Sequence, residues 1–326
     1  MNTLEIMEPL SIFYCFNGSI ISAMPYESNN SKYKIDQRCK ERVFLSKGKR
    51  PLLYINWLIT PKCNYDCIYC YAKDVMQCTQ EPHFDTLMNT AKSILKFDPI
   101  VVTLSGGEPF LSPHLEDIIL FLEGKIRIIV DTNGSITNNS LLQTIKEKDV
   151  LLRVSLDDID SRRNNKTRWN VCGGVQQTID FIKHSIQIGI DVVVQTVVTK
   201  VNIDHLSEIY EYLLGIGVKH WRLLPVSSLD LGTSFLKCTP QEIYSLKETL
   251  CNNMDMDIAI QKEYDMERAG IVLVSPEGTF LTINKEGKKV CIDPNNPFNP
   301  NVEIFNKAVD WDAHLLRYID KQEERE

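Results

Sequence analysis

The fold of this chain is decided by residues 100–132, whose sequence is IVVTLSGGEPFLSPHLEDIILFLEGKIRIIVDT. Residues 100–105 and 126–132 are apolar at nearly every position and rich in β-branched side chains, which predicts strands buried on both faces. The stretch between them predicts a helix from His114 to Gly124, because Pro113 favours a helix start and Gly124 a helix end. Strand, crossover helix and strand in succession predict a parallel β-sheet.

The same alternation of strand and helix runs from residue 52 to residue 225. Six strands are predicted: Leu53–Thr60, Ile100–Ser105, Ile126–Thr132, Val150–Leu156, Asp191–Thr199 and Val218–Pro225. Five helices are predicted between them: Thr86–Phe97, His114–Gly124, Ser140–Lys148, Val175–Ile188 and His205–Leu214. This pattern predicts an α/β fold built as a partial (β/α)6 TIM-like barrel, with an N-terminal extension and a small C-terminal α+β appendage.

The alternation is lost after Pro225. A helix is predicted over Thr239–Asn253, and a hairpin over Ile271–Val274 and Thr279–Ile283. The expected division is residues 1–50 as an extension or cover, residues 51–228 as the core, and residues 229–326 as a C-terminal substrate-side region. We expect the first and last of these to form a lid and substrate walls outside the parallel sheet.

Length and composition restrict the function. The chain has 326 residues, 43% of them hydrophobic, so it can bury a large core and is neither a disordered nor a disulfide-stapled protein. Its 36 basic and 43 acidic side chains give a net charge of −7, which argues against DNA as a partner. The N-terminus lacks a signal-peptide pattern, and no apolar run is long enough for a membrane span. We expect a cytoplasmic protein.

Three of the ten cysteines stand close together in Cys63-Asn64-Tyr65-Asp66-Cys67-Ile68-Tyr69-Cys70, just after the first predicted strand. In a reducing compartment such thiols are available for metals. Three thiolates on one loop can bind three irons of a cubic iron–sulfur cluster, which leaves the fourth iron open to another ligand. The alternative is a zinc site completed by a distant Cys or His, although structural zinc sites usually carry a second Cys-x-x-Cys pair and none occurs here.

The spacing Cys-x3-Cys-x2-Cys after the first strand of a βα series resembles the radical S-adenosylmethionine (radical SAM) superfamily, over roughly residues 52–228. The resemblance implies that Cys63, Cys67 and Cys70 hold a 4Fe-4S cluster, whose fourth iron binds the amino and carboxylate groups of SAM. It also implies that Tyr69 lies beside the adenine, to which an aromatic ring offers a flat apolar face.

A second motif, Ser105-Gly106-Gly107-Glu108-Pro109, follows the second predicted strand. Two glycines after a strand let the backbone approach a ligand closely. The motif is similar to the family's Gly-Gly-Glu-Pro sequence, which receives the methionine ammonium of SAM. Glu108 and the carbonyls of Gly106 and Gly107 accept hydrogen bonds, whereas an ammonium only donates them.

Polar side chains follow the third and fourth strands, at the rim where parallel βα folds gather their sites. Thr132, Ser155 and Asp157 resemble residues that line the SAM site, with Ser155 as a donor and Asp157 as an acceptor for the ribose or the carboxylate. Asn133-Gly134 is either part of this site or only a turn. Arg168 lies in an Arg-rich stretch expected to be a surface loop, and it is the candidate partner of the SAM carboxylate or of an anionic substrate.

The predicted hairpin resembles the one that opens the C-terminal domain of the SPASM and twitch branches of the superfamily, which hold additional clusters. The cysteines that would bind such clusters are missing, because Cys238, Cys251 and Cys291 stand alone. One 4Fe-4S cluster is therefore expected, together with SAM.

The resemblance implies an enzyme that reductively cleaves SAM to a 5′-deoxyadenosyl radical, which abstracts hydrogen from a peptide or small molecule. A flavodoxin or ferredoxin would supply the electron. One alternative is a viperin-like nucleotide-modifying radical SAM enzyme. Another is a non-catalytic iron–sulfur electron carrier or metal-scaffolded binding protein, which would not cleave SAM.

Overall fold

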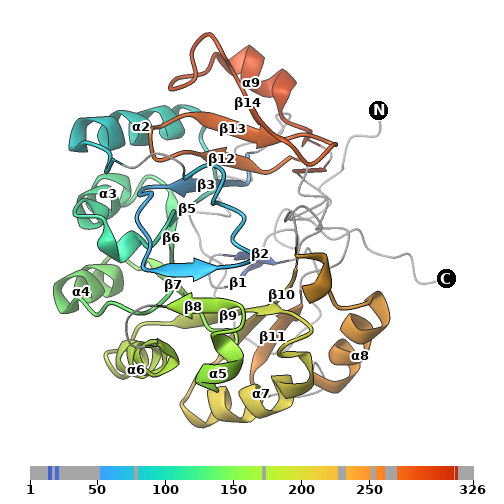
Figure 1. Cartoon of the computed structure of the whole chain (residues 1–326). Coiled ribbons are helices and arrows are strands. Elements are labelled where there is room, and N and C mark those ends of the chain that lie inside the picture. The colour runs from blue at the N-terminus through green and yellow to red at the C-terminus, as the bar shows by residue number, and fades with distance from the viewer. Residues whose placement is uncertain are drawn as a thin grey trace.

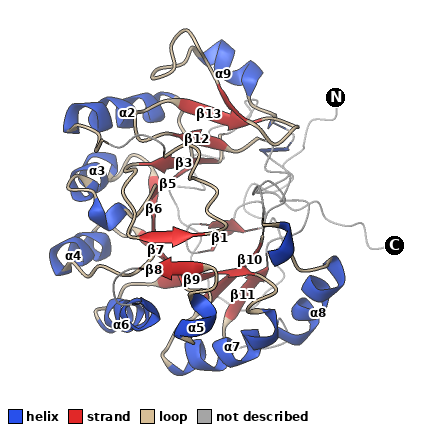
Figure 2. Cartoon of the chain, viewed as in Figure 1, coloured by secondary structure: helices blue, strands red, loops and turns tan. Residues whose placement is uncertain are grey.

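The computed structural model describes residues 14–16, 19–21, 52–76, 80–170, 174–226, 233–250, 255–260, 270–311 and 313–314. Figure 1 shows a curved β-sheet with helices along its outer side, and Figure 2 shows the same arrangement as an inner arc of strands and an outer arc of helices. The sheet has ten strands in the order β11-β10-β9-β7-β6-β5-β3-β12-β13-β14. The predicted α/β class and partial barrel are confirmed.

All six predicted strands are present and pair in parallel. They are β3 (Tyr54–Leu58), β5 (Val101–Ser105), β6 (Arg127–Thr132), β7 (Leu151–Ser155), β9 (Val192–Val198) and β10 (His220–Pro225). Nearly every position of β5 and β9 is buried, as their continuous apolar sequences predict. Their carboxyl ends lie at one rim of the sheet, and the loops that carry the predicted motifs leave from that rim.

The five predicted helices are also confirmed, each within two residues at either end. They are α2 (Phe84–Lys96), α3 (Leu115–Leu122), α4 (Asn139–Glu147), α6 (Gly174–Gln187) and α7 (Leu206–Gly215). In α2 the residues spaced by three and four, Leu87, Ala91 and Ile94, are buried against the sheet. Each large aliphatic side chain buried in this way contributes about 1.5–3 kcal/mol.

The C-terminal region does not lie outside the sheet, which corrects the sequence-based expectation. After α8 (Pro240–Leu250), the strand β11 (Asp257–Ile260) pairs in parallel with β10. The strand β12 (Val272–Val274) pairs in parallel with β3 at the other side. Without β11 and β12, the strands β10 and β3 would be edge strands with unpaired N–H and C=O groups. The side chains of β12 are fully buried, which favours its position inside the sheet.

The predicted hairpin is confirmed as β12 with β13 (Phe280–Ile283), and β14 (Lys289–Cys291) adds to it in antiparallel fashion. The helix α9 (Val302–Ala308) follows, and its Phe305 stacks on Phe97 at the end of α2 with 4.1 Å between the ring centres. In the predicted extension, β1 (Tyr14–Phe16) pairs with β2 (Ser19–Ile21).

Residues 161–170 are only in part the surface loop that the sequence suggested, because Arg162 and Lys166 are exposed but Arg168 is buried. They contain the short helix α5 (Ser161–Asn164) and the strand β8 (Arg168–Asn170). The strand β8 pairs with β4 (Tyr65–Cys67), which lies inside the cysteine loop, and Arg168 is buried. The expectation failed because an Arg-rich stretch is normally solvated, whereas here the backbone of the cysteine loop supplies a partner strand. No helix within the described ranges is both long and apolar enough to cross a bilayer.

Candidate functional site

The cysteine loop leaves the carboxyl end of β3 and carries three thiols that form no disulfide, those of Cys63, Cys67 and Cys70. They lie within electrostatic reach of one another, because negative charge on Cys70 raises the pKa of both Cys63 and Cys67. Burial is the main cause of these shifts and raises the pKa of Cys67 to about 12, whereas Arg168 lowers it. Three sulfurs gathered on one loop fit a cubic cluster, which takes one protein ligand per iron.

A single metal ion such as zinc differs from a cluster, because all the ligands of one ion must converge on one point. Within the described residues, no three His, Cys, Asp or Glu side chains do so.

Gly106 and Gly107 pack against the backbone at the start of the cysteine loop. The N–H of Gly107 donates to the carbonyl of Thr60 at 2.8 Å, and the N–H of Glu108 donates to the carbonyl of Lys62 at 2.7 Å. A Cβ on Gly107 would lie 1.9 Å from the Lys62 oxygen, and one on Gly106, whose φ is +134°, would lie 2.5 Å from the Thr60 oxygen. The sequence suggested that these glycines let the backbone approach a ligand closely. In the structure they let the Gly-Gly-Glu-Pro loop approach the backbone of Thr60 and Lys62 closely.

Glu108 is fully buried, and three donors hold its carboxylate. Its Oε1 accepts from the N–H of Phe110 at 3.0 Å and from Oγ1 of Thr132 at 2.7 Å, while its Oε2 accepts from the N–H of Asn133 at 2.6 Å. Desolvation nevertheless raises the pKa of Glu108 to about 7 and outweighs these hydrogen bonds and the attraction of Arg168. Thr132 therefore contacts Glu108, the residue predicted to bind the ammonium.

Asn133 connects the end of β6 to the cysteine loop. Its Nδ2 donates to Oδ1 of Asn64 at 2.9 Å, and Nδ2 of Asn64 donates to Oγ of Ser135 at 2.8 Å. Gly134 has a φ of +69°, so this pair also forms a turn. The turn alternative is thus confirmed, and the place of Asn133-Gly134 in a SAM site stays a prediction. Asn64 was missed by the sequence analysis, and its only signal was its place between two of the cysteines.

The strands β4 and β8 form a two-stranded ribbon with two different faces. Cys67 lies opposite Arg168 on one face, and Asp66 lies opposite Trp169 on the other. The first face is directed inward, since Arg168 is buried and its guanidinium carbon lies 5.3 Å from the centre of the Tyr65 ring. The second face is exposed to solvent. The ribbon therefore covers one of the three cysteine ligands.

Tyr69, Asp157 and Arg168 contact one another. The hydroxyl of Tyr69 donates to Oδ2 of Asp157, and Nη1 of Arg168 lies 3.9 Å from Oδ1 of the same carboxylate. That Oδ1 also accepts from the N–H of Val197 at 2.9 Å. Desolvation raises the pKa of Asp157 and raises that of Tyr69 well above its usual value. Three residues assigned separately to the adenine, the ribose and the carboxylate of SAM are thus partners of one another.

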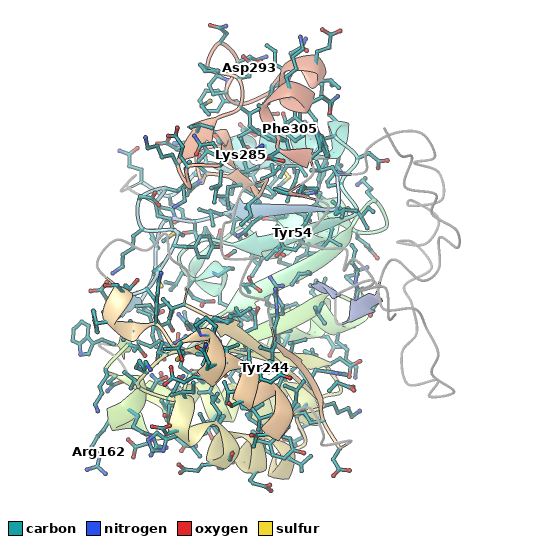
Figure 3. The ribbon with its side chains drawn as sticks, turned by 90° about the vertical axis from the view of Figure 1, so that its right-hand side faces the viewer. Tyr54, Arg162, Tyr244, Lys285, Asp293 and Phe305 are labelled. Atoms are coloured by element: carbon teal, nitrogen blue, oxygen red, sulfur yellow. The ribbon has the colours of Figure 1, made fainter. Side chains whose placement is uncertain are left out.

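A polar network that the sequence analysis missed lies on the inner face of the sheet. Arg153 in β7 is buried and donates to Asp131 from Nε at 2.5 Å and from Nη2 at 2.7 Å. It also donates to the hydroxyl of Tyr54 at 2.9 Å. Tyr54 lies in the middle of the molecule in Figure 3. A buried guanidinium needs a carboxylate partner. The signal in the sequence was a charged residue in the middle of an apolar strand, the Arg of Leu-Leu-Arg-Val-Ser.

The network continues toward β10 through Gln195. Its Nε2 donates to Oδ1 of Asp131 at 3.4 Å, and its Oε1 accepts from Nη1 of Arg222 at 3.2 Å. Ser155 is half-buried and lies next to Gln195 in the β7–β9 register. Of the predicted site residues, Ser155 therefore lies beside this network, whereas the others surround the cysteine loop.

Comparisons with known proteins agree with this geometry. The profile of the radical SAM superfamily matches residues 57–213. An uncharacterized protein of Methanocaldococcus jannaschii is 30% identical over 175 residues, which are 49% of this chain and 58% of that protein. The Fe-coproporphyrin III synthase of Methanosarcina barkeri is 24% identical over 212 residues, which are 63% of this chain and 50% of that enzyme.

Among solved structures, Streptococcus suis SuiB bound to the precursor peptide SuiA has the same fold, with a TM-score of 0.63 and 15% identity. The match covers 86% of this chain and 74% of SuiB. The chain spans 58% and 50% of the lengths of the two curated relatives. The superfamily implies a 4Fe-4S cluster and SAM, for which the cysteine loop has fitting donors. From the matched profile, the fold and the three-cysteine loop, we conclude that this chain belongs to the radical SAM superfamily.

Proposed function

We propose that the chain is a radical SAM enzyme that modifies a peptide or a small molecule. The observation that carries this proposal is the attachment of the three-thiol loop to the Gly-Gly-Glu-Pro loop through two backbone hydrogen bonds of 2.8 and 2.7 Å. When bound, one cluster and SAM supply a 5′-deoxyadenosyl radical by one-electron reduction and cleavage of SAM. The residues of the chain have the task of holding both groups and excluding water.

Cys63, Cys67 and Cys70 would hold the cluster. Glu108 would bind the SAM ammonium, as the resemblance of the Gly-Gly-Glu-Pro loop implies, because its carboxylate is an acceptor held in place by Phe110, Thr132 and Asn133. The pKa of Glu108 is about 7, so the carboxyl group is only partly charged near neutral pH. A cation bound beside it would favour the charged form. The remaining members of the proposed SAM site are Tyr69, Gly106, Gly107, Pro109, Thr132, Ser155, Asp157 and Arg168.

A single cluster is proposed because Cys238 and Cys291, the cysteines outside the loop whose side chains are described, belong to no group of three possible metal ligands. Anaerobic reconstitution should yield about four irons per chain. A value near eight irons would show that a second cluster is bound.

The substrate class rests on two relatives. SuiB was solved with a precursor peptide, and the Methanosarcina barkeri relative is a synthase of an iron porphyrin. A peptide or a small molecule thus remains the proposed substrate, and a flavodoxin or ferredoxin the proposed reductase. The viperin-like alternative requires several cations for a triphosphate, but Arg153 on the inner face is already bound to Asp131.

SAM cleavage under dithionite tests the proposal. Reconstituted protein should form 5′-deoxyadenosine, and Cys63→Ala, Cys67→Ala or Cys70→Ala should abolish both this product and the absorption at roughly 400 nm. Conversion of Cys238 to Ala is the matched control and should change neither. An intact cluster that cleaves no SAM would favour the electron-carrier alternative.

A further inference from the structure

We propose that the outer face of the β4–β8 ribbon, here called the Trp169 face, is the docking site for a small acidic one-electron carrier protein that reduces the cluster. The face consists of Asp66, Ile68 and Trp169. Lys73 forms an ion pair with Asp66, and Arg162 and Lys166 precede Trp169 in the chain. The inference rests on the proposed function, since it presupposes a cluster at the cysteine loop.

The exposure of Trp169 is the first observation. Its side chain is 53% exposed, and Ile68 on the neighbouring strand segment is 41% exposed. A tryptophan gains free energy from burial and is enriched at the centres of protein interfaces. Two large apolar side chains together on a two-stranded ribbon therefore indicate a surface that a partner covers.

The position of this face relative to the cysteines is the second observation. Trp169 follows Arg168, which lies opposite Cys67, and it lies opposite Asp66, which precedes Cys67. Side chains of successive residues point to opposite faces of a strand, so Trp169 and Cys67 lie on opposite sides of one ribbon. The ribbon is a single layer of two strands, so one layer of backbone separates the Trp169 face from the side chain of Cys67. An electron carrier docked there would lie close to the cluster.

The local charge is the third observation and bears on the charge of the partner. Residues 160–170 carry four cations and one anion, whereas the whole chain has a net charge of −7. Arg163 is neutralised by Asp158 and Glu208, with nitrogen–oxygen distances of 2.8 and 2.9 Å.

Arg162 is 92% exposed at the side-chain level, and its only close anion among the described residues is Asp160 at 3.9 Å. It points outward at the edge of the molecule in Figure 3. Lys166 is also exposed. Lys73 and Asp66 form an ion pair, so they add no net charge. Arg162 and Lys166 are thus exposed cations within seven residues of Trp169 in the chain. They favour an acidic partner, whereas in a symmetric dimer the same cations of both copies would face one another and repel.

Rapid mixing with photoreduced flavodoxin tests the inference, with cluster reduction followed as loss of absorption at roughly 400 nm. Trp169→Asp should slow reduction by flavodoxin about tenfold, because loss of an interface anchor commonly costs 1–2 kcal/mol. Reduction by dithionite should be unchanged, since a small reductant needs no docking surface. Arg162→Glu combined with Lys166→Glu should slow the flavodoxin reaction too, and rising salt should slow it in the wild-type protein.

Phe298→Asp is the matched control, because Phe298 is 54% exposed and belongs to the C-terminal region. It should leave both reductions unchanged. Equal flavodoxin rates for Trp169→Asp and the wild type would overturn the inference, as would equal slowing with both reductants. If Trp169→Asp instead dissociates a dimer in light scattering without changing reduction, the face belongs to a second copy. A chain that assembles no cluster would refute the proposed function itself, and the docking site with it.

Discussion

The hydroxyl of Tyr69 donates a hydrogen bond to the carboxylate of Asp157, although the two residues are 88 positions apart in the chain. Tyr69 lies in the cysteine loop and Asp157 shortly after β7, so this bond connects the predicted cluster ligands to the carboxyl end of β7. Both groups are buried. The cysteine loop is thus held by the Tyr69–Asp157 hydrogen bond, by the Gly-Gly-Glu-Pro loop, by Asn133 and by the strand β8.

Replacing Tyr69 by Phe should lower the stability of the protein. The substitution leaves the ring but removes the donor from a buried carboxylate, which typically costs about 1–3 kcal/mol. Urea unfolding of the apo protein measures this change. Tyr244→Phe is the control, because Tyr244 is exposed on α8 and should change the free energy of unfolding by less than about 0.5 kcal/mol. Equal values for the two variants would show that the Tyr69–Asp157 bond adds no stability.

Replacing Gly107 by Ala should displace the cysteine loop. The new Cβ would meet the backbone oxygen of Lys62 at 1.9 Å, and backbone atoms cannot move aside as a flexible side chain can. We expect iron binding after reconstitution to fall to a small fraction of the wild-type value.

The control for this variant is Gly215→Ala at the end of α7. A Cβ there has no atom within 4 Å, and this substitution should stabilise the helix by about 0.5–1 kcal/mol. Full iron content in Gly107→Ala would contradict the contact with Lys62.

Glu108 should make the stability of the apo protein depend on pH. Its pKa is about 7 in the folded state and 4.5 for an unperturbed carboxyl group, so the folded state binds more protons than the unfolded state between these values. Stability should therefore fall as pH rises from about 4.5 to 7, by a few kcal/mol. Unfolding free energies across this range measure the slope, and subtraction of the Glu108→Gln profile isolates the contribution of Glu108. An identical slope in both proteins would contradict the raised pKa.

Arg168 should raise the reduction potential of the cluster. It is a buried cation opposite Cys67, and a positive charge stabilises the additional electron of the reduced state. Arg168→Met should shift the potential to a more negative value, as measured by a redox titration monitored by electron paramagnetic resonance. Arg168→Lys should restore part of the shift because it keeps the charge. Arg162→Met removes an exposed arginine nearby and should leave the potential almost unchanged, and a similar shift in it would refute a specific role of Arg168.

Much of the framework could be predicted from local sequence. The β-branched runs and the flanking Pro and Gly residues located six strands and five helices, because burial on both faces leaves a continuous apolar pattern. The cysteine spacing located the candidate ligands, since three sulfurs must be close in sequence to lie on one loop. The strands β4, β8 and β11 were missed because each is only three or four residues long and depends on a partner strand for its conformation.

The amino-acid sequence by itself determined the order of the elements and the positions of the three candidate thiols, because these follow from patterns that are local in the chain. Its motifs also carried the resemblance to the superfamily. Only the tertiary structure decided that Arg168 is buried beside Cys67, that Glu108 is held by Thr132 and Asn133, and that β11 and β12 extend the sheet at both sides. These relationships join residues that are far apart in sequence. They arise because buried polar groups and open strand edges must find partners wherever the fold provides them.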